Sequence, residues 1–174
     1  MLEKEIKILE INKEELIKKL EELGAVKTFE DTVCDTYYDY ANSKMEDKKR
    51  LFRLRTKGDC NLYTIKKKES KTDIRISQET ECVVTDIEGF KKTLEKYGLI
   101  PTREKVKQRL SYKIDHLEFD IDEYEGIPTF LEIEASSDEE INLWIEKLGL
   151  QNNVRKTFGS RGLFEYYNMP YTEF

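Results

Sequence analysis

Hydrophobic and polar residues alternate along eight segments of the chain. In a β-strand, such alternation places the two kinds of side chain on opposite faces. The segments span residues 2–9, 33–40, 50–56, 61–68, 74–84, 104–113, 117–124 and 129–135. Turn sequences such as Lys57-Gly58-Asp59 join several of them tightly. Eight mostly antiparallel strands predict a closed or nearly closed barrel.

Three other segments repeat their hydrophobic residues with the period of an amphipathic α-helix. They span residues 13–23, 87–97 and 139–148. Each is followed by a glycine that can adopt the left-handed conformation of a helix C-terminus: Gly24, Gly98 and Gly149. Asn12 and Asp138 are the expected N-caps of the first and third helices. We therefore predict one α+β domain over residues 1–174, an eight-stranded antiparallel barrel with helices packed on its outside.

Composition narrows the classes of function. The chain has 30 Lys and Arg against 36 Asp and Glu, and its net charge of −6 disfavours a broad basic surface for nucleic acid. We expect no membrane span, because no apolar run is long enough, and no signal peptide at Met1. Cys34, Cys60 and Cys82 form no C-x-x-C pair and are expected to be unpaired, buried or half-buried side chains. These features together favour a cytoplasmic protein.

The choice of metal is narrowed by the scarcity of histidine. His116 is the only histidine, so a zinc site and a Ser/His/Asp triad are both poor hypotheses. A metal would have to be held by oxygen ligands, which favours Mg²⁺ or Mn²⁺. The sequence also lacks the P-loop and Rossmann glycine motifs, so neither mode of nucleotide binding is supported.

The polar faces of the strands tend to carry charges of one sign. Acidic residues gather on the first, fifth, seventh and eighth strands, and basic residues on the third, fourth and sixth. For any single strand, the simplest interpretation is a solvated surface. Helices that cover the apolar faces would, however, turn all of the charged faces into the barrel. An acidic wall opposite a basic wall favours a lumen that binds divalent cations together with a polyanion.

The same residues resemble a known family. Glu3-x-Glu5-x-Lys7 is similar to the ExExK signature of the CYTH superfamily, also called the triphosphate tunnel metalloenzymes. Further segments follow in the order of that family: Asp35-Thr36-Tyr37-Tyr38-Asp39, Leu51-x-Arg53-Leu54-Arg55, Thr64-x-Lys66, Glu79-x-Glu81, Lys107-x-Arg109, Asp120-x-Asp122 and Phe130-Leu131-Glu132-Ile133-Glu134. The resemblance therefore covers nearly the whole chain.

This resemblance implies an eight-stranded tunnel in which acids bind Mg²⁺ or Mn²⁺ and bases bind a triphosphate. The implied metal ligands are Glu3, Glu5, Glu79, Glu81, Asp120, Asp122, Glu132 and Glu134. The implied substrate ligands are Lys7, Arg53, Arg55, Lys66, Lys107, Arg109 and, near the tunnel mouth, Lys156. Lys68 shares the face of Lys66, and Arg75 could substitute for the basic residue that many relatives carry at the position of Ser77. Glu3, Glu5, Lys7 and Arg55 are the residues expected to act in catalysis.

Three functions remain open on these residues. The leading hypothesis is metal-dependent hydrolysis of tripolyphosphate, thiamine triphosphate or a nucleoside triphosphate. The second is a class IV adenylyl cyclase, for which Tyr37, Tyr38 and Tyr63 could stack a base or simply pack. The third is a module that binds polyphosphate or nucleotide without catalysis. The aromatic segment 158–167 either plugs one end of the tunnel or makes the contact of a homodimer.

Overall fold

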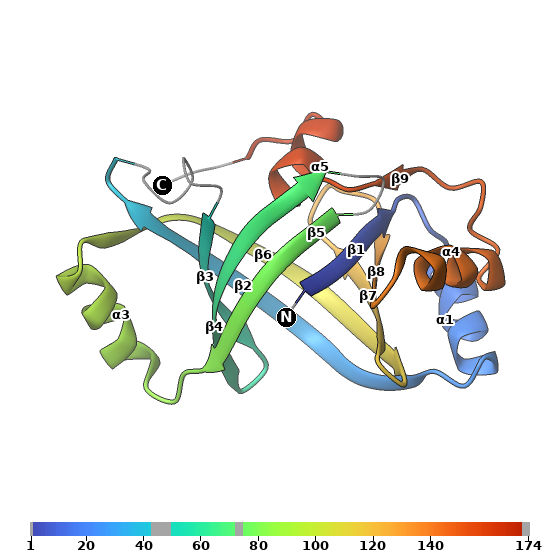
Figure 1. The fold of residues 1–174 in the computed structure, drawn as a ribbon, viewed down its shortest axis with the longest axis horizontal. Coiled ribbons are helices and arrows are strands. Elements are labelled where there is room, and N and C mark those ends of the chain that lie inside the picture. Colours follow the sequence, from blue (N-terminus) through green and yellow to red (C-terminus); the bar gives the residue numbers. More distant parts are fainter. Residues whose placement is uncertain (1, 43–49, 72–74, 172–174) are drawn as a thin grey trace.

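Eight strands form a closed antiparallel barrel (Figure 1). The computed structural model describes residues 2–42, 50–71 and 75–171, and the side chains of residues 4–42, 50–67 and 75–171. The barrel strands are β1 (Leu2–Ile8), β2 (Val26–Tyr40), β3 (Arg50–Lys57), β4 (Cys60–Lys71), β5 (Arg75–Val83), β6 (Leu99–Ile114), β7 (Leu117–Glu123) and β8 (Phe130–Ala135). They lie in the order β5-β4-β3-β2-β6-β7-β8-β1, and pairing of β1 with β5 closes the ring. The predicted α+β barrel is confirmed.

The three predicted helices are α1 (Lys13–Glu22), α3 (Ile87–Lys96) and α4 (Asp138–Lys147). The side chain of Asn12 accepts a hydrogen bond from the Glu15 amide and caps α1 as predicted. The N-cap of α4 is Ser137 rather than Asp138, because the Ser137 hydroxyl accepts from the Glu140 amide. Gly24, Gly98 and Gly149 follow their helices with φ of +88°, +79° and +71°.

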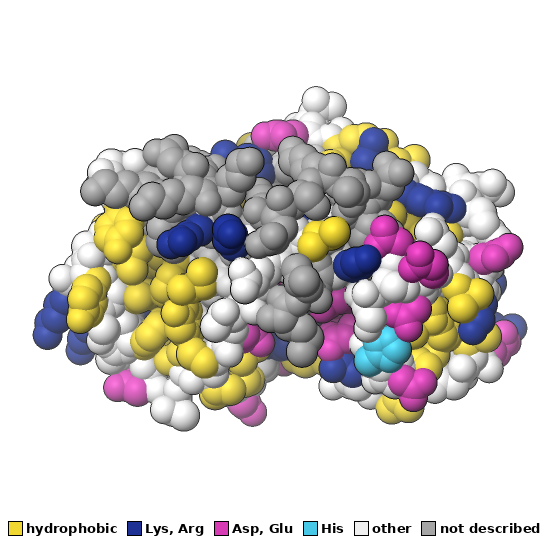
Figure 2. All heavy atoms as spheres, viewed as in Figure 1, with side chains coloured by type: hydrophobic (Ala, Val, Ile, Leu, Met, Phe, Trp, Pro, Cys, Tyr) yellow, Lys and Arg dark blue, Asp and Glu magenta, His cyan; other side chains and the backbone are white. Residues whose placement is uncertain are grey.

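These helices cover the apolar faces of the strands, which leaves the charged faces inside. Ile6 and Ile8 of β1 belong to a buried cluster that also contains the apolar residues of α1 and α4. Phe52 and Leu54 of β3 belong to a second cluster with Leu94 of α3. Figure 1 shows α3 at one end of the barrel wall and α1 beside α4 at the other. On the face seen in Figure 2, side chains of both signs lie near one another over α1 and α4.

Strands β2 and β6 are longer than their alternation predicts. Residues 26–32 of β2 are mostly exposed and do not alternate, yet they pair continuously with the second half of β6 apart from one irregularity. At its other end β6 runs through Pro101, beside a register shift between Tyr37 and Tyr38. A bulge tolerates proline because the ladder hydrogen bond that proline cannot donate is already missing. Long-range pairing therefore extends both strands beyond the signal in their sequence.

The cysteines are free, as expected, but only partly in the expected surroundings. Cys34 is half-buried, whereas Cys60 and Cys82 are exposed, so the expectation of buried or half-buried side chains is wrong for two of the three. In the part of the chain that the structure describes, no helix is long and apolar enough to span a membrane.

Candidate active site inside the barrel

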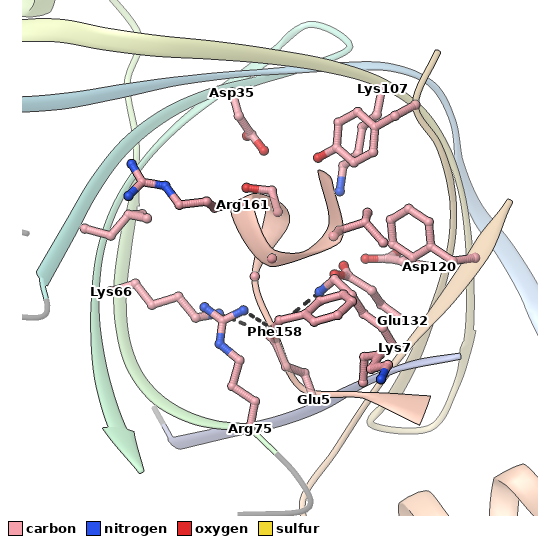
Figure 3. A pocket seen from close by; sticks show the side chains of 18 of the residues that line it. Glu5, Lys7, Asp35, Lys66, Arg75, Lys107, Asp120, Glu132, Phe158 and Arg161 are labelled. Carbon is pink, nitrogen blue, oxygen red and sulfur yellow. Dashed lines mark hydrogen bonds and ion pairs between the residues drawn. The ribbon is translucent and has the colours of Figure 1, made fainter. Parts of the chain in front are cut away.

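The barrel encloses a cavity of about 1160 Å³ (Figure 3). Thirteen of the residues predicted as metal or substrate ligands line it. The basic ones are Lys7, Arg53, Arg55, Lys66, Arg75, Lys107, Arg109 and Lys156. The acidic ones are Glu5, Glu79, Asp120, Glu132 and Glu134. Closure of the barrel thus brings residues from seven strands and the C-terminal segment around one volume.

Two predicted residues, Glu81 and Asp122, stand apart from this lining, and two others cannot be placed in it. Glu81 lies near the end of β5 with 42% of its side chain exposed, and it accepts a hydrogen bond from Thr64. Asp122 is fully buried behind the lining. Glu3 and Lys68 are part of β1 and β4, but their side chains lie outside the described residues.

Strand register arranges the charges in rows across the acidic side of the barrel. In one row, Glu118 of β7, Glu134 of β8, Glu5 of β1 and Arg75 of β5 are successive cross-strand partners. Directly opposite residues on one face have Cβ atoms about 5 Å apart. Three neighbouring carboxylates therefore lie in a row, and a single arginine lies at its end.

The next row follows the same strands one pleat further on. Asp120 of β7, Glu132 of β8 and Lys7 of β1 are cross-strand partners, and Lys7 also pairs with Lys156 of β9 (Arg155–Lys156). Each row therefore passes from acids to bases.

The carboxylate of Glu5 is held in its ionised form. Its Oε1 lies 2.6 Å from Arg75 Nη1, and its Oε2 lies 3.1 Å from Lys66 Nζ. Burial opposes ionisation, but Lys66, Lys7 and Arg75 outweigh it and lower the pKa of Glu5 to about 2. Arg75 thus projects into the lumen, as expected if it substitutes for a base at Ser77.

Glu134, the cross-strand partner of Glu5, has the opposite environment. Burial and the nearby Glu118 carboxylate raise the pKa of Glu134 to about 7. In the described residues, no three ligating side chains lie close enough to form a metal site already assembled. Glu5 and Glu134 nevertheless offer hard oxygen ligands, and a divalent cation would relieve the repulsion between their carboxylates. The donor set therefore fits Mg²⁺ or Mn²⁺.

On the basic side, Asp35 of β2 lies beside two arginines and orients one of them. Arg55 forms a bidentate pair with it, with Nε–Oδ1 and Nη2–Oδ2 distances of 2.6 and 2.9 Å. Arg53 Nε lies 3.8 Å from the same carboxylate. Although burial acts against the charge, these two guanidinium groups hold the pKa of Asp35 far below its usual range. Arg55 is thereby fixed along the cavity wall, whereas Arg53 donates from Nη2 to Thr64 and its buried Nε makes no hydrogen bond to any described residue.

A second buried carboxylate, Asp122, fixes Lys107 and Arg109. The Arg109 guanidinium contacts both oxygens of Asp122 at 2.6 Å, and Lys107 Nζ lies 2.6 Å from Oδ2. Arg109 also donates to Glu132 at 2.9 Å and pairs with Asp120. Burial and the neighbouring Arg109 lower the pKa of Lys107. In this structure Asp122 therefore positions cations that line the cavity.

The C-terminal segment plugs one end of the barrel. After β9 the chain enters the lumen, and residues 157–163 line the cavity together with Glu165 and Tyr166. Helix α5 (Ser160–Tyr166) lies across the opening in Figure 3. Lys156 Nζ lies 4.8 Å from the centroid of the Tyr166 ring. Of the two roles left open for this segment, the structure bears out the plug; a homodimer stays a prediction.

Several cavity residues were not assigned from the sequence. Asp35 shares the face of Tyr37 on β2, so alternation could have identified it. Lys105 shares the face of Lys107 on β6 and is buried, although it does not line the cavity. Arg103 lay outside the predicted strand because β6 continues through Pro101. Arg161 enters from α5, and no strand pattern could place it. Of the three tyrosines considered for base stacking, Tyr37 lines the cavity, while Tyr38 and Tyr63 pack in the outer cluster around Phe52.

Comparison with known proteins agrees with this architecture. The model of the CYTH domain family matches residues 1–154. A Methanocaldococcus jannaschii protein named "Putative adenylate cyclase MJ0240" is 26% identical over 141 residues, which are 78% of each chain. The solved PH1012 protein of Pyrococcus horikoshii OT3 is 25% identical with a TM-score of 0.71, over 86% of this chain and 92% of that one.

The solved structure of a Vibrio parahaemolyticus protein, described as a putative adenylate cyclase, shares the fold. Its TM-score is 0.79 at 16% identity, over 95% of this chain and 98% of that one. Because the family match spans most of the chain and the barrel has the expected strands, this chain belongs to the CYTH domain family.

Proposed function

We propose that this protein is a divalent-metal-dependent triphosphatase that cleaves the terminal phosphate from a triphosphate held in the barrel. The observation that carries the proposal is the cavity lining, in which eight basic and five acidic predicted ligands surround one volume. A triphosphate needs several cationic ligands, and their charges are also what a loose phosphoryl-transfer transition state requires.

The basic residues bind and orient the phosphates. Arg53 and Arg55 present their guanidinium groups from β3, where Asp35 holds Arg55. Lys107 presents its ammonium group and Arg109 its guanidinium group from β6, on the other side of β2. Arginine suits phosphate because its planar group can make two hydrogen bonds to the same phosphate. The plug α5 keeps bulk water from one end of the lumen, which strengthens each of these interactions.

Acidic residues of the lumen would hold the metal that the proposed reaction requires. Glu5, Glu134 and Glu79 are the proposed ligands, together with Glu3, Asp120 and Glu132. A divalent cation bound there would neutralise phosphate charge and lower the pKa of the attacking water. Within the described residues, neither cysteine nor histidine lines the cavity, so attack by water agrees better with the site than a covalent intermediate on such a residue.

A second candidate is adenylyl cyclase activity, which is favoured by the name of the M. jannaschii relative. In that reaction the ribose hydroxyl attacks the α-phosphate of ATP and pyrophosphate leaves. A structural neighbour from Hippeastrum is described as a putative adenylyl cyclase with a dominant triphosphatase activity, so naming as a cyclase does not exclude hydrolysis.

Product analysis separates these functions. The protein is incubated with tripolyphosphate, thiamine triphosphate or ATP, each with Mg²⁺ and with Mn²⁺. Orthophosphate release supports the triphosphatase, and cyclic AMP with pyrophosphate supports the cyclase. Tight binding of tripolyphosphate without any product would identify a binding module.

Matched variants test whether the lumen is the site. Glu5→Gln and Arg55→Ala are expected to lower turnover at least about 100-fold, as loss of an electrostatic ligand to the transition state typically does. Glu123→Gln and Arg155→Ala remove the same kinds of charge outside the cavity and should retain full activity. Unchanged turnover in both lumen variants would refute the proposed site.

A further inference from the structure

One part of the cavity combines aromatic rings with cations and has no role in the proposed hydrolysis. We call Tyr37, Arg103, Lys105, Arg161 and Tyr171 the mouth cluster. Tyr37 of β2 and Arg103 of β6 are cross-strand partners, and the Arg103 Cζ lies 4.3 Å from the centroid of the Tyr37 ring. Arg161 enters from the plug helix, as Figure 3 shows. All of the cluster except Lys105 lines the cavity.

Three cations converge on the ring of Tyr171. Lys105 Nζ lies 4.2 Å from the ring centroid, Arg161 Cζ lies 5.4 Å from it and Arg103 Cζ lies 5.7 Å from it. The Tyr171 hydroxyl lies 3.1 Å from Ser160 Oγ. Cations of like charge repel one another, and the negative face of an aromatic ring offsets that repulsion. This place therefore has the chemistry to hold a planar aromatic ring.

A buried donor in the cluster also lacks a partner. Arg103 Nε is inaccessible to solvent and makes no hydrogen bond to any described residue. An unmade hydrogen bond of this kind is costly. A ring that carries acceptor atoms could satisfy Arg103 Nε, whereas the Tyr171 ring offers it no acceptor at this distance.

The mouth cluster lies next to the phosphate ligands. Arg103, Lys105, Lys107 and Arg109 share one face of β6 at successive alternate positions, which are about 7 Å apart along a strand. A triphosphate held by Lys107 and Arg109 would thus place an attached organic group within reach of Arg103 and Lys105.

We propose that the mouth cluster is a binding subsite for the planar ring of an organic triphosphate, and that Tyr171 competes with this ring as an internal occupant. The inference rests on the proposed function, since it takes the lumen to hold the phosphates. Tyr171 is then a specificity-determining residue that favours inorganic tripolyphosphate over ATP or thiamine triphosphate.

The test compares Tyr171→Ala with Tyr167→Ala, which removes a neighbouring tyrosine whose hydroxyl contacts Glu10 instead of the cavity. The value of kcat/KM is measured for ATP, thiamine triphosphate and tripolyphosphate. Stacking of one ring changes affinity by roughly 5- to 150-fold, so Tyr171→Ala should raise the ratio of organic to inorganic substrate by about 10-fold. Tyr167→Ala should leave that ratio unchanged.

A second variant identifies the subsite, and a binding measurement separates this inference from the proposed reaction. Adding Arg103→Ala to Tyr171→Ala should cancel the gain. If the wild type hydrolyses no triphosphate, the triphosphatase is refuted, and the ratio of Kd values for ATP and tripolyphosphate from calorimetry takes the place of kcat/KM. A ratio in Tyr171→Ala within about twofold of wild type would overturn the subsite by either measurement.

Discussion

Asp122 offers a direct test of how the lumen charges are stabilised. Its side chain is 0% exposed, and it neutralises Lys107 and Arg109, whose side chains are each 5% exposed. Asp122→Asn keeps the volume of the side chain but removes its charge, so two buried cations lose their shared partner. Breaking a buried pair by removing one partner generally costs about 3–5 kcal/mol.

The surroundings place the expected cost at the lower end of that range. Arg109 keeps Asp120 and Glu132 as partners, and Lys107 can release its proton more readily because burial and Arg109 already lower its pKa. We therefore expect a loss of about 3 kcal/mol, which for a chain of this size lowers Tm by roughly 6–12 °C. Scanning calorimetry or urea denaturation of Asp122→Asn measures both quantities.

The matched control is Glu123→Gln on the same strand. Glu123 pairs with Lys13 at 2.7 Å, but both side chains are more than one third exposed, so its loss should cost less than about 1 kcal/mol. Tripolyphosphate should raise the Tm of Asp122→Asn more than that of the wild type, because its charge replaces the lost carboxylate. Equal stability of Asp122→Asn and Glu123→Gln would show that the lumen pair contributes no more than a surface pair.

Three further predictions concern other parts of the barrel. The pKa of Glu134 in the folded state is raised to about 7, above that of an unfolded glutamate, so the wild type should gain stability from this group as pH falls from 8 toward 4.5. In urea denaturation, Glu134→Gln should therefore be more stable than the wild type at pH 8 and similar to it at pH 5. An equal difference in stability at both pH values would contradict this prediction. Asp35→Asn should raise KM for tripolyphosphate about 10-fold, since Arg55 loses its bidentate partner, while Asp31→Asn, exposed on the same strand, should not change it. Gly98→Ala should lower the free energy of unfolding by about 1 kcal/mol, because Gly98 has φ of +79°, which strains a residue with a side chain. The added methyl group itself has space, so the cost comes from the backbone alone. An unchanged free energy of unfolding by calorimetry would argue against that backbone strain.

Much of the fold could be predicted because strand alternation in a closed barrel is unambiguous. Once helices cover Ile6, Ile8, Phe52 and Leu54, the charged residues between them have to face inward. A side chain that continues an alternation, such as Arg55 or Glu132, is therefore placed correctly from its sequence position alone.

The limits of the prediction come from interactions between distant residues. The bulge beside Pro101 and the pairing that extends β6 are tertiary effects. For this reason the sequence pattern did not place Arg103 in a strand. Alternation assigns a face but not a partner, so it could not show that Asp122 lies behind the lining and binds Arg109. The position of α5 depends on how the chain leaves β9, and the local pattern of residues 158–167 carries no information on that.

The pairing of β1 with β5 has a consequence for how the protein folds. Glu5 pairs with Arg75 on one side and with Glu134 on the other, so β1 joins partners separated from it by about 70 and 130 residues. Contacts of such long range form slowly because the loops between them must close first. The ring of strands is therefore expected to close late in folding. Until it closes, the lumen charges stay hydrated, and their free energy of desolvation does not yet oppose folding. Folding and assembly of the candidate active site are then the same kinetic event, which ligands that neutralise those charges should accelerate.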